Sequence, residues 1–291
     1  MIRRTCAAVW RLLTAPFRFI TRPFLAIREV VTHEPEDTPA TEAFARTLQN
    51  PSLLLEHLEA LRGHLLRSVA ALVVTTAVSF AIATRILDFL AAPVGGIGVL
   101  QSIEVTESVS AFMRVSLLSG FVLAFPYICL EVFLFVAPGL KQRERVLVLT
   151  SIPAAFLLFI AGIAFAYYIM LPVALPFLMH FMGITTVPRP ANYVRFVTGL
   201  LFWIGVSFQF PLIVYALASL GIIKAKLLTD GWRIAIIVIA VGAAAITPTT
   251  DPVNMALLMA PMSGLYFISI LLAKVAERGR KRRAEMEESQ A

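Results

Sequence analysis

Charged residues are scarce in this 291-residue sequence, since Lys, Arg, Asp and Glu together make up 15% of it while 59% is hydrophobic. The mean hydropathy of +0.84 lies far outside the usual balance of soluble domains. The sequence therefore predicts an integral membrane protein. Its net charge of +7 comes from cations between the apolar runs and at both ends, as membrane topology demands, so we do not expect nucleic acid as a partner.

Signatures of catalysis and metal binding are also missing. The sequence has no HExxH, GxSxG or Walker pattern, no GxGxxG before a helix, and no paired aspartates within an apolar run. Its four histidines lie mostly far apart and outside or at the edges of the apolar runs, which argues against a metal site. Cys6 and Cys129 do not form a plausible disulfide pair. We expect a protein that is not an enzyme and has no metal or other cofactor.

Apolar runs separated by polar connections predict an all-α protein with six transmembrane helices. The third run contains Pro153, Pro172 and Pro176, so we expect it either to be kinked or tilted or to form a cap outside the lipid with its last turns. The fifth is short for a hydrocarbon core of about 30 Å. The six segments are predicted at about 68–90, 110–136, 147–182, 197–220, 234–246 and 253–273.

Charged segments flank this predicted membrane domain, which covers residues 51–273. Residues 1–50 hold a basic stretch with interleaved aromatics and then an acidic linker. The basic stretch suits either a helix on an anionic membrane surface or an unstructured tail, and we do not expect it to be a cleaved signal peptide. Residues 274–291 are predicted to be a charged, solvated tail. Lys and Arg gather after the second and fourth segments and at the C-terminus, so both termini are predicted to be cytoplasmic.

The stretch FLFVAPGLKQRERV, residues 133–146, places one carboxylate among cations. Pro138 and Gly139 are expected to end the second helix, whose unpaired carbonyl groups carry a partial negative charge. Glu144 adds a full negative charge, and Phe135 offers an aromatic face on which a guanidinium can stack. One interpretation is a site for an arginine-bearing ligand. The other, simpler on the residues alone, is an acid in the first turn of a helix beside topology-setting cations.

Polar side chains within the apolar runs are few, and two of them, Glu131 and Gln209, are candidates for a function because a polar group is costly there. Glu131 precedes Phe135 by one helical turn, so both project from the same face. It is interpreted either as functional or as a side chain that snorkels to the interface or pairs with a nearby lysine. Gln209, just before Pro211, suits an interhelical hydrogen bond of about 1 kcal/mol and a contact with a partner protein equally well.

Taken together, these stretches resemble the TatC family, the six-span subunit of the twin-arginine translocase. The resemblance runs in order over about residues 53–273, through HLEALR, FVAPGL with the following RER, SFQFP and TPTTDP. It implies a concave bowl of kinked helices in the prokaryotic cytoplasmic membrane. It also implies a receptor that binds twin-arginine signal peptides of folded proteins and nucleates the complex for export driven by the proton-motive force.

The resemblance also implies roles for individual residues. Phe135 and Glu144 match the family positions that bind the arginine pair, which favours the ligand-site interpretation. The family signature HLEELR, whose acids are associated with signal-peptide recognition, leaves Glu59 as the candidate here because Ala60 replaces the second acid. Gln209 replaces a glutamate that the family links to partner contact. The expected loop-shaping residues are Pro138, Gly139, Pro248 and Asp251.

The partners that the resemblance implies are twin-arginine signal peptides, single-span subunits of the TatA and TatB type, further copies of the chain in a multimeric receptor complex, and membrane lipids. Two other functions stay open. A secondary transporter or channel for a small anionic solute predicts inverted repeats and facing charges at mid-membrane, neither of which is visible in the sequence. A structural assembly scaffold predicts that Glu144 is dispensable.

Overall fold

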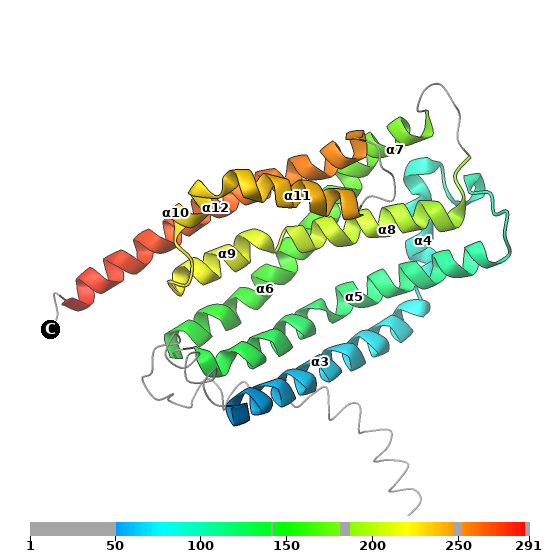
Figure 1. Ribbon diagram of the computed structural model, residues 1–291. Helices are drawn as coiled ribbons and strands as arrows, with labels where there is room; N and C mark the ends of the chain where they lie inside the picture. The colour runs from blue at the N-terminus through cyan, green and yellow to red at the C-terminus, as the bar shows by residue number, and fades with distance from the viewer. Residues whose placement is uncertain (1–50, 141, 181–186, 247–251, 289–291) are drawn as a thin grey trace, which may run out of the picture. The chain divides into compact units, whose positions relative to one another are not determined.

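The computed structural model describes residues 51–140, 142–180, 187–246 and 252–288 (Figure 1). Within these ranges every regular element is helical. The chain divides into two compact units, one of residues 1–78 with 119–154 and the other of residues 79–118 with 155–291. The prediction of an all-α, multispan membrane protein is confirmed.

Ten α-helices lie in the described residues, joined in places by single turns of other helix types. The α-helices are α3 (Pro51–Phe80), α4 (Ala83–Ala91), α5 (Thr106–Val136), α6 (Gln142–Phe165), α7 (Leu171–Met179), α8 (Pro190–Ser207), α9 (Phe210–Ser219), α10 (Ala225–Asp230), α11 (Trp232–Ile246) and α12 (Pro252–Glu288). The other turns are the 3-10 helices η1 (Ala92–Val94), η2 (Ile97–Val99) and η3 (Ala137–Gly139), and the π-helical segment η4 (Ala166–Met170).

Five helical stretches of the described residues are long and apolar enough to cross a membrane. They match five of the six predicted segments in order, and the predicted fifth segment corresponds to a shorter apolar helix at Trp232–Ala245. The last span lies within α12, which continues without a break to Glu288. The predicted tail therefore begins as a helix. The five spans are His57–Phe80, Thr106–Gly139, Glu144–Met179, Pro190–Ser219 and Met255–Arg280.

The first predicted segment, 68–90, does not coincide with one helix. Helix α3 begins much earlier and ends at Phe80, and α4 follows as a separate element. The last carbonyl groups of α4 have their own partners in the second unit, because the Tyr167 hydroxyl donates to Phe89 O at 2.7 Å and the Tyr193 hydroxyl to Leu90 O at 2.6 Å. These bonds cap the end of α4, where Phe89 O also accepts from the backbone N–H of Ala92.

The irregularity that prolines predicted in the third segment is the π-helical segment η4. Pro172 lies two residues after the end of this segment. It has no backbone N–H, and its ring would crowd the carbonyl of Tyr168 in a regular α-helix. A wider π turn relieves that crowding. The same segment directs the buried Tyr167 toward the end of α4.

In the first unit, α3 and α5 run antiparallel with their backbones in close contact. The Thr75 hydroxyl lies 2.8 Å from the carbonyl oxygen of Gly120. A β-carbon at Gly120 would lie only 2.6 Å from the Cα of Thr76, so only glycine permits this approach, as at many helix contacts in membranes. Helix α6 packs on α5 through a core that includes Phe133 and Ile152.

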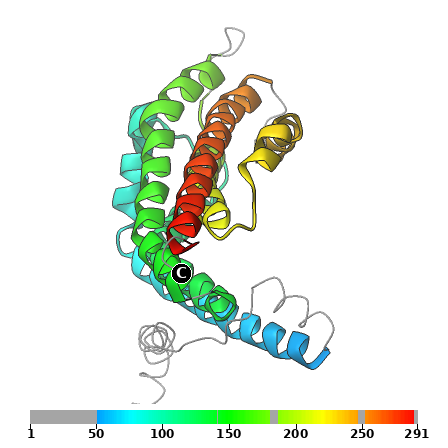
Figure 2. The same ribbon diagram turned by 90° about the vertical axis from the view of Figure 1, so that its left-hand side faces the viewer.

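In the second unit, α12 lies along α9 (Figure 1) and α11 lies beside α12 (Figure 2). Helices α6 and α8 approach as closely as α3 and α5 do, since a β-carbon at Gly162 would lie 2.9 Å from the Cα of Gly205. The core of this unit contains the fully buried Val197 and Ile204 of α8.

Candidate functional site

A buried cluster of polar side chains joins α3 to α5 near one end of their contact. The Glu131 side chain is only 1% exposed, and the Nε of Arg67 donates to its two carboxylate oxygens at 2.9 and 3.0 Å. The Tyr127 hydroxyl donates to Oε1 at 2.7 Å, and His64 Nδ1 lies 2.7 Å from Oε2. These four residues are referred to below as the Glu131 cluster.

The cluster corrects one interpretation drawn from the sequence. Glu131 neither snorkels to the interface nor pairs with a lysine, because it is buried and its partners are Arg67 and His64 of α3. The Arg67 guanidinium and the Tyr127 hydroxyl donate to this carboxylate and offset the cost of burying its charge. A buried ion pair contributes little net stability by comparison with an apolar contact, but it fixes which residues face each other.

The aromatic ring of Phe135 lies one turn along α5 from Glu131 and contacts two histidines of α3. Its centroid is 4.5 Å from that of His57, with the planes tilted by 33°, and 6.0 Å from that of His64 in an edge arrangement. Phe135 is half-buried and His57 is exposed. The ring that the sequence predicted as a stacking surface is therefore itself partly stacked.

The turn after α5 follows the prediction. Helix α5 ends just before η3, which contains Pro138 and Gly139, and Glu144 lies in the first turn of α6. The Glu144 side chain is half-buried. Phe135 and Glu144 thus flank the same short turn, one in the last helical turn before it and the other in the first turn after it.

One cation of this connection makes a buried contact that the sequence did not indicate. Arg145 is buried, at 6% exposure, and its Nε donates to the carbonyl oxygen of Leu140 at 2.9 Å. This bond ties the start of α6 to the end of the turn and satisfies a carbonyl that the turn would otherwise leave unpaired. Arg145 therefore helps to fix where Glu144 begins its helix.

Glu59 is not brought to Phe135. It is exposed on α3, and two residues along an α-helix correspond to a rotation of about 200°, so Glu59 lies on the side of α3 opposite to His57. His57, His64, Arg67 and Tyr127 were missed from the sequence. Their signal is spacing, because residues seven apart on α3 and four apart on α5 each repeat on one face.

Gln209 makes the interhelical bond that the sequence suggested. It lies at the junction of α8 and α9 and its Nε2 donates to the carbonyl oxygen of Ala155 on α6 at 3.1 Å. Pro248 and Asp251, the other predicted loop residues, lie outside the described residues.

A second ion-pair group lies in the second unit. Arg189, just before α8, donates from Nε to the Glu107 carboxylate at 2.7 Å, and its Nη2 bonds the same carboxylate and that of Glu104. Glu107 is buried whereas the Glu104 side chain is 68% exposed. The hydrogen bonds to Glu107, and then to Glu104, raise the pKa of Arg189 above its ordinary value.

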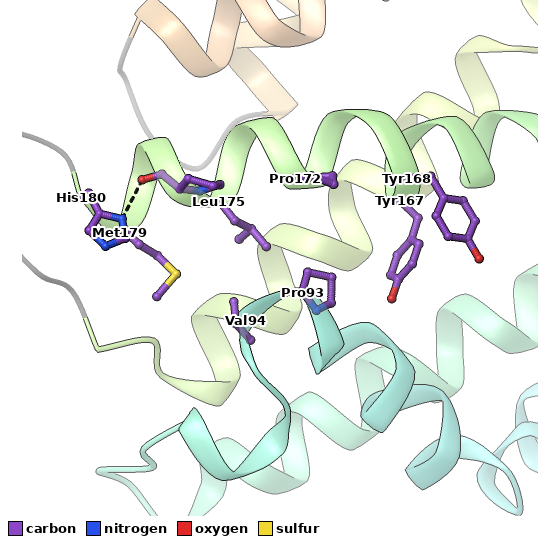
Figure 3. A pocket seen from close by; sticks show the side chains of 9 residues that line it. Pro93, Val94, Tyr167, Tyr168, Pro172, Leu175, Met179 and His180 are labelled. Carbon is purple, nitrogen blue, oxygen red and sulfur yellow. Dashed lines mark hydrogen bonds between the residues drawn. The ribbon is translucent and has the colours of Figure 1, made fainter.

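The second unit also contains a cavity of about 540 Å³ beside η4 (Figure 3). Its walls are mostly apolar, with Tyr167, Tyr168 and His180 as the residues that carry polar groups. His180 bonds the Pro176 carbonyl of its own helix. In the part of the chain that the structure describes, no three His, Cys, Asp or Glu side chains gather as a metal site would require. The lining residues are Pro93, Val94, Tyr167, Tyr168, Pro172, Leu175, Pro176, Met179 and His180.

Comparison with known proteins gives one consistent result. Residues 56–261 match the family model described as Sec-independent protein translocase protein (TatC). The Sec-independent protein translocase protein TatC of Carboxydothermus hydrogenoformans is 37% identical over 77% of this chain and 93% of its own length. The chloroplastic TATC of Arabidopsis thaliana is 33% identical over 77% of this chain and 67% of its own length. A crystal structure of the twin-arginine translocase receptor TatC superposes with a TM-score of 0.68 at 30% identity, covering 76% of this chain and 99% of that one.

Proposed function

The chain belongs to the TatC family of Sec-independent protein translocase proteins, and from this premise we propose that Phe135 and Glu144 form its recognition site for the arginine pair of a signal peptide. The protein is a multi-pass membrane receptor subunit of the twin-arginine translocase and not an enzyme. Residue roles, orientation in the membrane and individual partners are the content of the proposal.

The observation that carries the proposal is that an aromatic ring and a carboxylate flank one turn in the same compact unit. Phe135 lies in the last turn of α5 and Glu144 in the first turn of α6. Both side chains are half-buried, so they are accessible on one side and partly shielded from water on the other. A guanidinium bonds a carboxylate through its fork while its flat face stacks on an aromatic ring, and partial burial strengthens both interactions.

The electrostatics of the turn support a cationic ligand. The C-terminal end of α5 carries a partial negative charge, to which Glu144 adds a full one. The bond from Arg145 to Leu140 O keeps that cation turned toward the backbone.

The proposal includes an orientation and a set of partners. The turn between α5 and α6 faces the cytoplasm, as do both termini, in a prokaryotic cytoplasmic membrane, because the cation-rich connections are retained on that side. The partners are twin-arginine signal peptides of folded cargo, single-span subunits of the TatA and TatB type, further copies of the chain and membrane lipids. Glu59, exposed on another face of α3, is proposed to contact signal-peptide residues outside the arginine pair.

Titration of the purified protein with signal peptides tests the site. Wild type and Glu144→Ala are each titrated with a peptide bearing Arg-Arg and with one bearing Lys-Lys. A charge-assisted contact contributes about 1.5–3 kcal/mol, so Glu144→Ala should weaken Arg-Arg binding by about tenfold or more. Equal affinity in all four combinations would remove the recognition function from this site. The same result would favour the scaffold interpretation, in which Glu144 is dispensable.

A further inference from the structure

The proposed function gives no role to His57 or to the Glu131 cluster, although both adjoin Phe135. His57 is exposed, yet its ring lies against Phe135 with a 4.5 Å centroid separation and a tilt of 33°. The centroid distance lies within the range of interacting aromatic pairs, and the rings are tilted relative to each other. With one face toward Phe135, the exposed His57 ring leaves its other face open to a ligand, and Phe135 lies behind it.

The contact between the two rings depends on the register of α3 against α5. His57 meets Phe135, and Arg67, further along α3, meets Glu131, one turn back along α5. His64 lies between them and touches both Phe135 and Glu131. A slip of one helical turn would move His57 along the helix axis by about 5.4 Å and separate the rings.

The close approach at Gly120 holds α3 against α5 further along the helix, whereas the leucines at this end of α3 do little to prevent a slip. Leu58, Leu61 and Leu65 are all strongly exposed, and lipid offers them the same apolar surroundings in any register. The Glu131 cluster, by contrast, forms in one register only, because a shift of one turn would separate the buried Glu131 carboxylate from the Arg67 guanidinium. The cost of an unpaired buried charge therefore favours the observed register.

Resting on the proposed function, we infer that His57 and Phe135 jointly form the surface on which a signal-peptide guanidinium stacks, and that Glu131 is the residue that positions them. His57 contacts the ligand. Glu131 acts through Arg67 and His64 and does not touch the ligand.

This arrangement determines specificity for arginine over lysine. The Glu144 carboxylate attracts either cation, whereas a flat guanidinium stacks on two rings in a way that a compact, strongly hydrated ammonium does not. The ratio of the Lys-Lys to the Arg-Arg dissociation constant therefore measures the stacking surface separately from the charge. A purely structural defect would lower the fraction of competent protein and leave that ratio unchanged.

The test measures this ratio for full-length protein in lipid nanodiscs, using His57→Ala, His57→Phe, Glu131→Gln and the charge-reversed pair Glu131→Arg with Arg67→Glu. His180→Ala, which removes another exposed histidine, is the matched control. One exposed cation–π contact corresponds to a factor of about two to five. We expect His57→Ala and Glu131→Gln to lower the ratio by that factor. His57→Phe, the charge-reversed pair and His180→Ala should keep the wild-type ratio.

The outcomes separate the inference from the proposed function. If the wild-type protein shows no preference for Arg-Arg over Lys-Lys, both the inference and the proposed function are wrong. A wild-type preference that persists unchanged in His57→Ala overturns the inference and leaves the recognition site at Glu144 intact. If Glu131→Gln does not fold, the comparison of His57→Ala with His57→Phe decides, because neither change touches the Glu131 cluster.

Discussion

The Nε of Arg67 on α3 donates to both carboxylate oxygens of Glu131 on α5, at 2.9 and 3.0 Å. Because Glu131 is buried and Arg67 only 22% exposed, removing either residue alone leaves the charge of the other without its ion-pair partner. We expect Glu131→Leu or Arg67→Met to lower the free energy of unfolding by about 3 kcal/mol, measured by reversible unfolding in mixed micelles.

The double variant Glu131→Leu with Arg67→Met is the control for that prediction. It removes both charges and replaces them with apolar groups, so it should be more stable than either single variant. If the two single effects simply added, Glu131 and Arg67 would not be energetically coupled.

The close approach of α3 and α5 at Gly120 predicts a second effect. A β-carbon there would lie 2.6 Å from the Cα of Thr76, and since the obstacle is backbone the helices must separate. We expect Gly120→Ala to destabilise the protein by about 1–3 kcal/mol in the same unfolding assay. The matched change Gly242→Ala in α11, where a β-carbon meets nothing within 4 Å, should be neutral or slightly stabilising. Equal effects at both glycines would exclude backbone contact as the cause.

The hydrogen bond from Tyr193 to the end of α4 predicts a third effect. Tyr193→Phe removes the hydroxyl that donates to Leu90 O and should cost about 1 kcal/mol. Hydrogen–deuterium exchange in α4 should accelerate. Tyr168→Phe is the control, because that side chain is 67% exposed. Unchanged exchange in α4 after Tyr193→Phe would mean that the hydroxyl does not hold the helix end.

The two carboxylates around Arg189 should not be equivalent. Glu107 is buried and Glu104 is largely exposed, and exposed ion pairs contribute little because water and salt screen them. Glu107→Ala should therefore lower the unfolding temperature clearly more than Glu104→Ala, and raised salt should reduce only the Glu104 effect. The reverse order would show that the exposed pair carries the interaction.

Much of the fold was predictable from local chemistry. The Pro138-Gly139 pair ends α5, and Glu144 lies in the first turn of the next helix as expected of a first-turn acid. The prolines of the third segment predicted an irregularity, and Gln209 predicted an interhelical bond. Each of these follows from what a residue does to its own helix or from its cost in an apolar run.

Features that depend on which helices meet were not predictable. The predicted first segment runs past Phe80 to Leu90, and its charges, Arg85 and Asp88, come only after the point where α3 ends. Hydropathy alone therefore does not mark the end of α3. Glu131 could be recognised as unusual, but Arg67 precedes it by 64 residues and only the tertiary contact pairs them. In the sequence Arg145 does not differ from the other cations of its loop, so its bond to Leu140 O could not be predicted.

The central claim is that Glu144 binds the arginine pair of the signal peptide. A double-mutant cycle tests this claim most directly. Dissociation constants are measured for wild type and Glu144→Gln, each with an Arg-Arg and a Gln-Gln signal peptide. A direct contact predicts a coupling energy of about 1.5–3 kcal/mol, so Glu144→Gln should weaken the Arg-Arg peptide by tenfold or more and barely affect the Gln-Gln peptide. A coupling energy near zero, with both peptides weakened equally, would contradict the account.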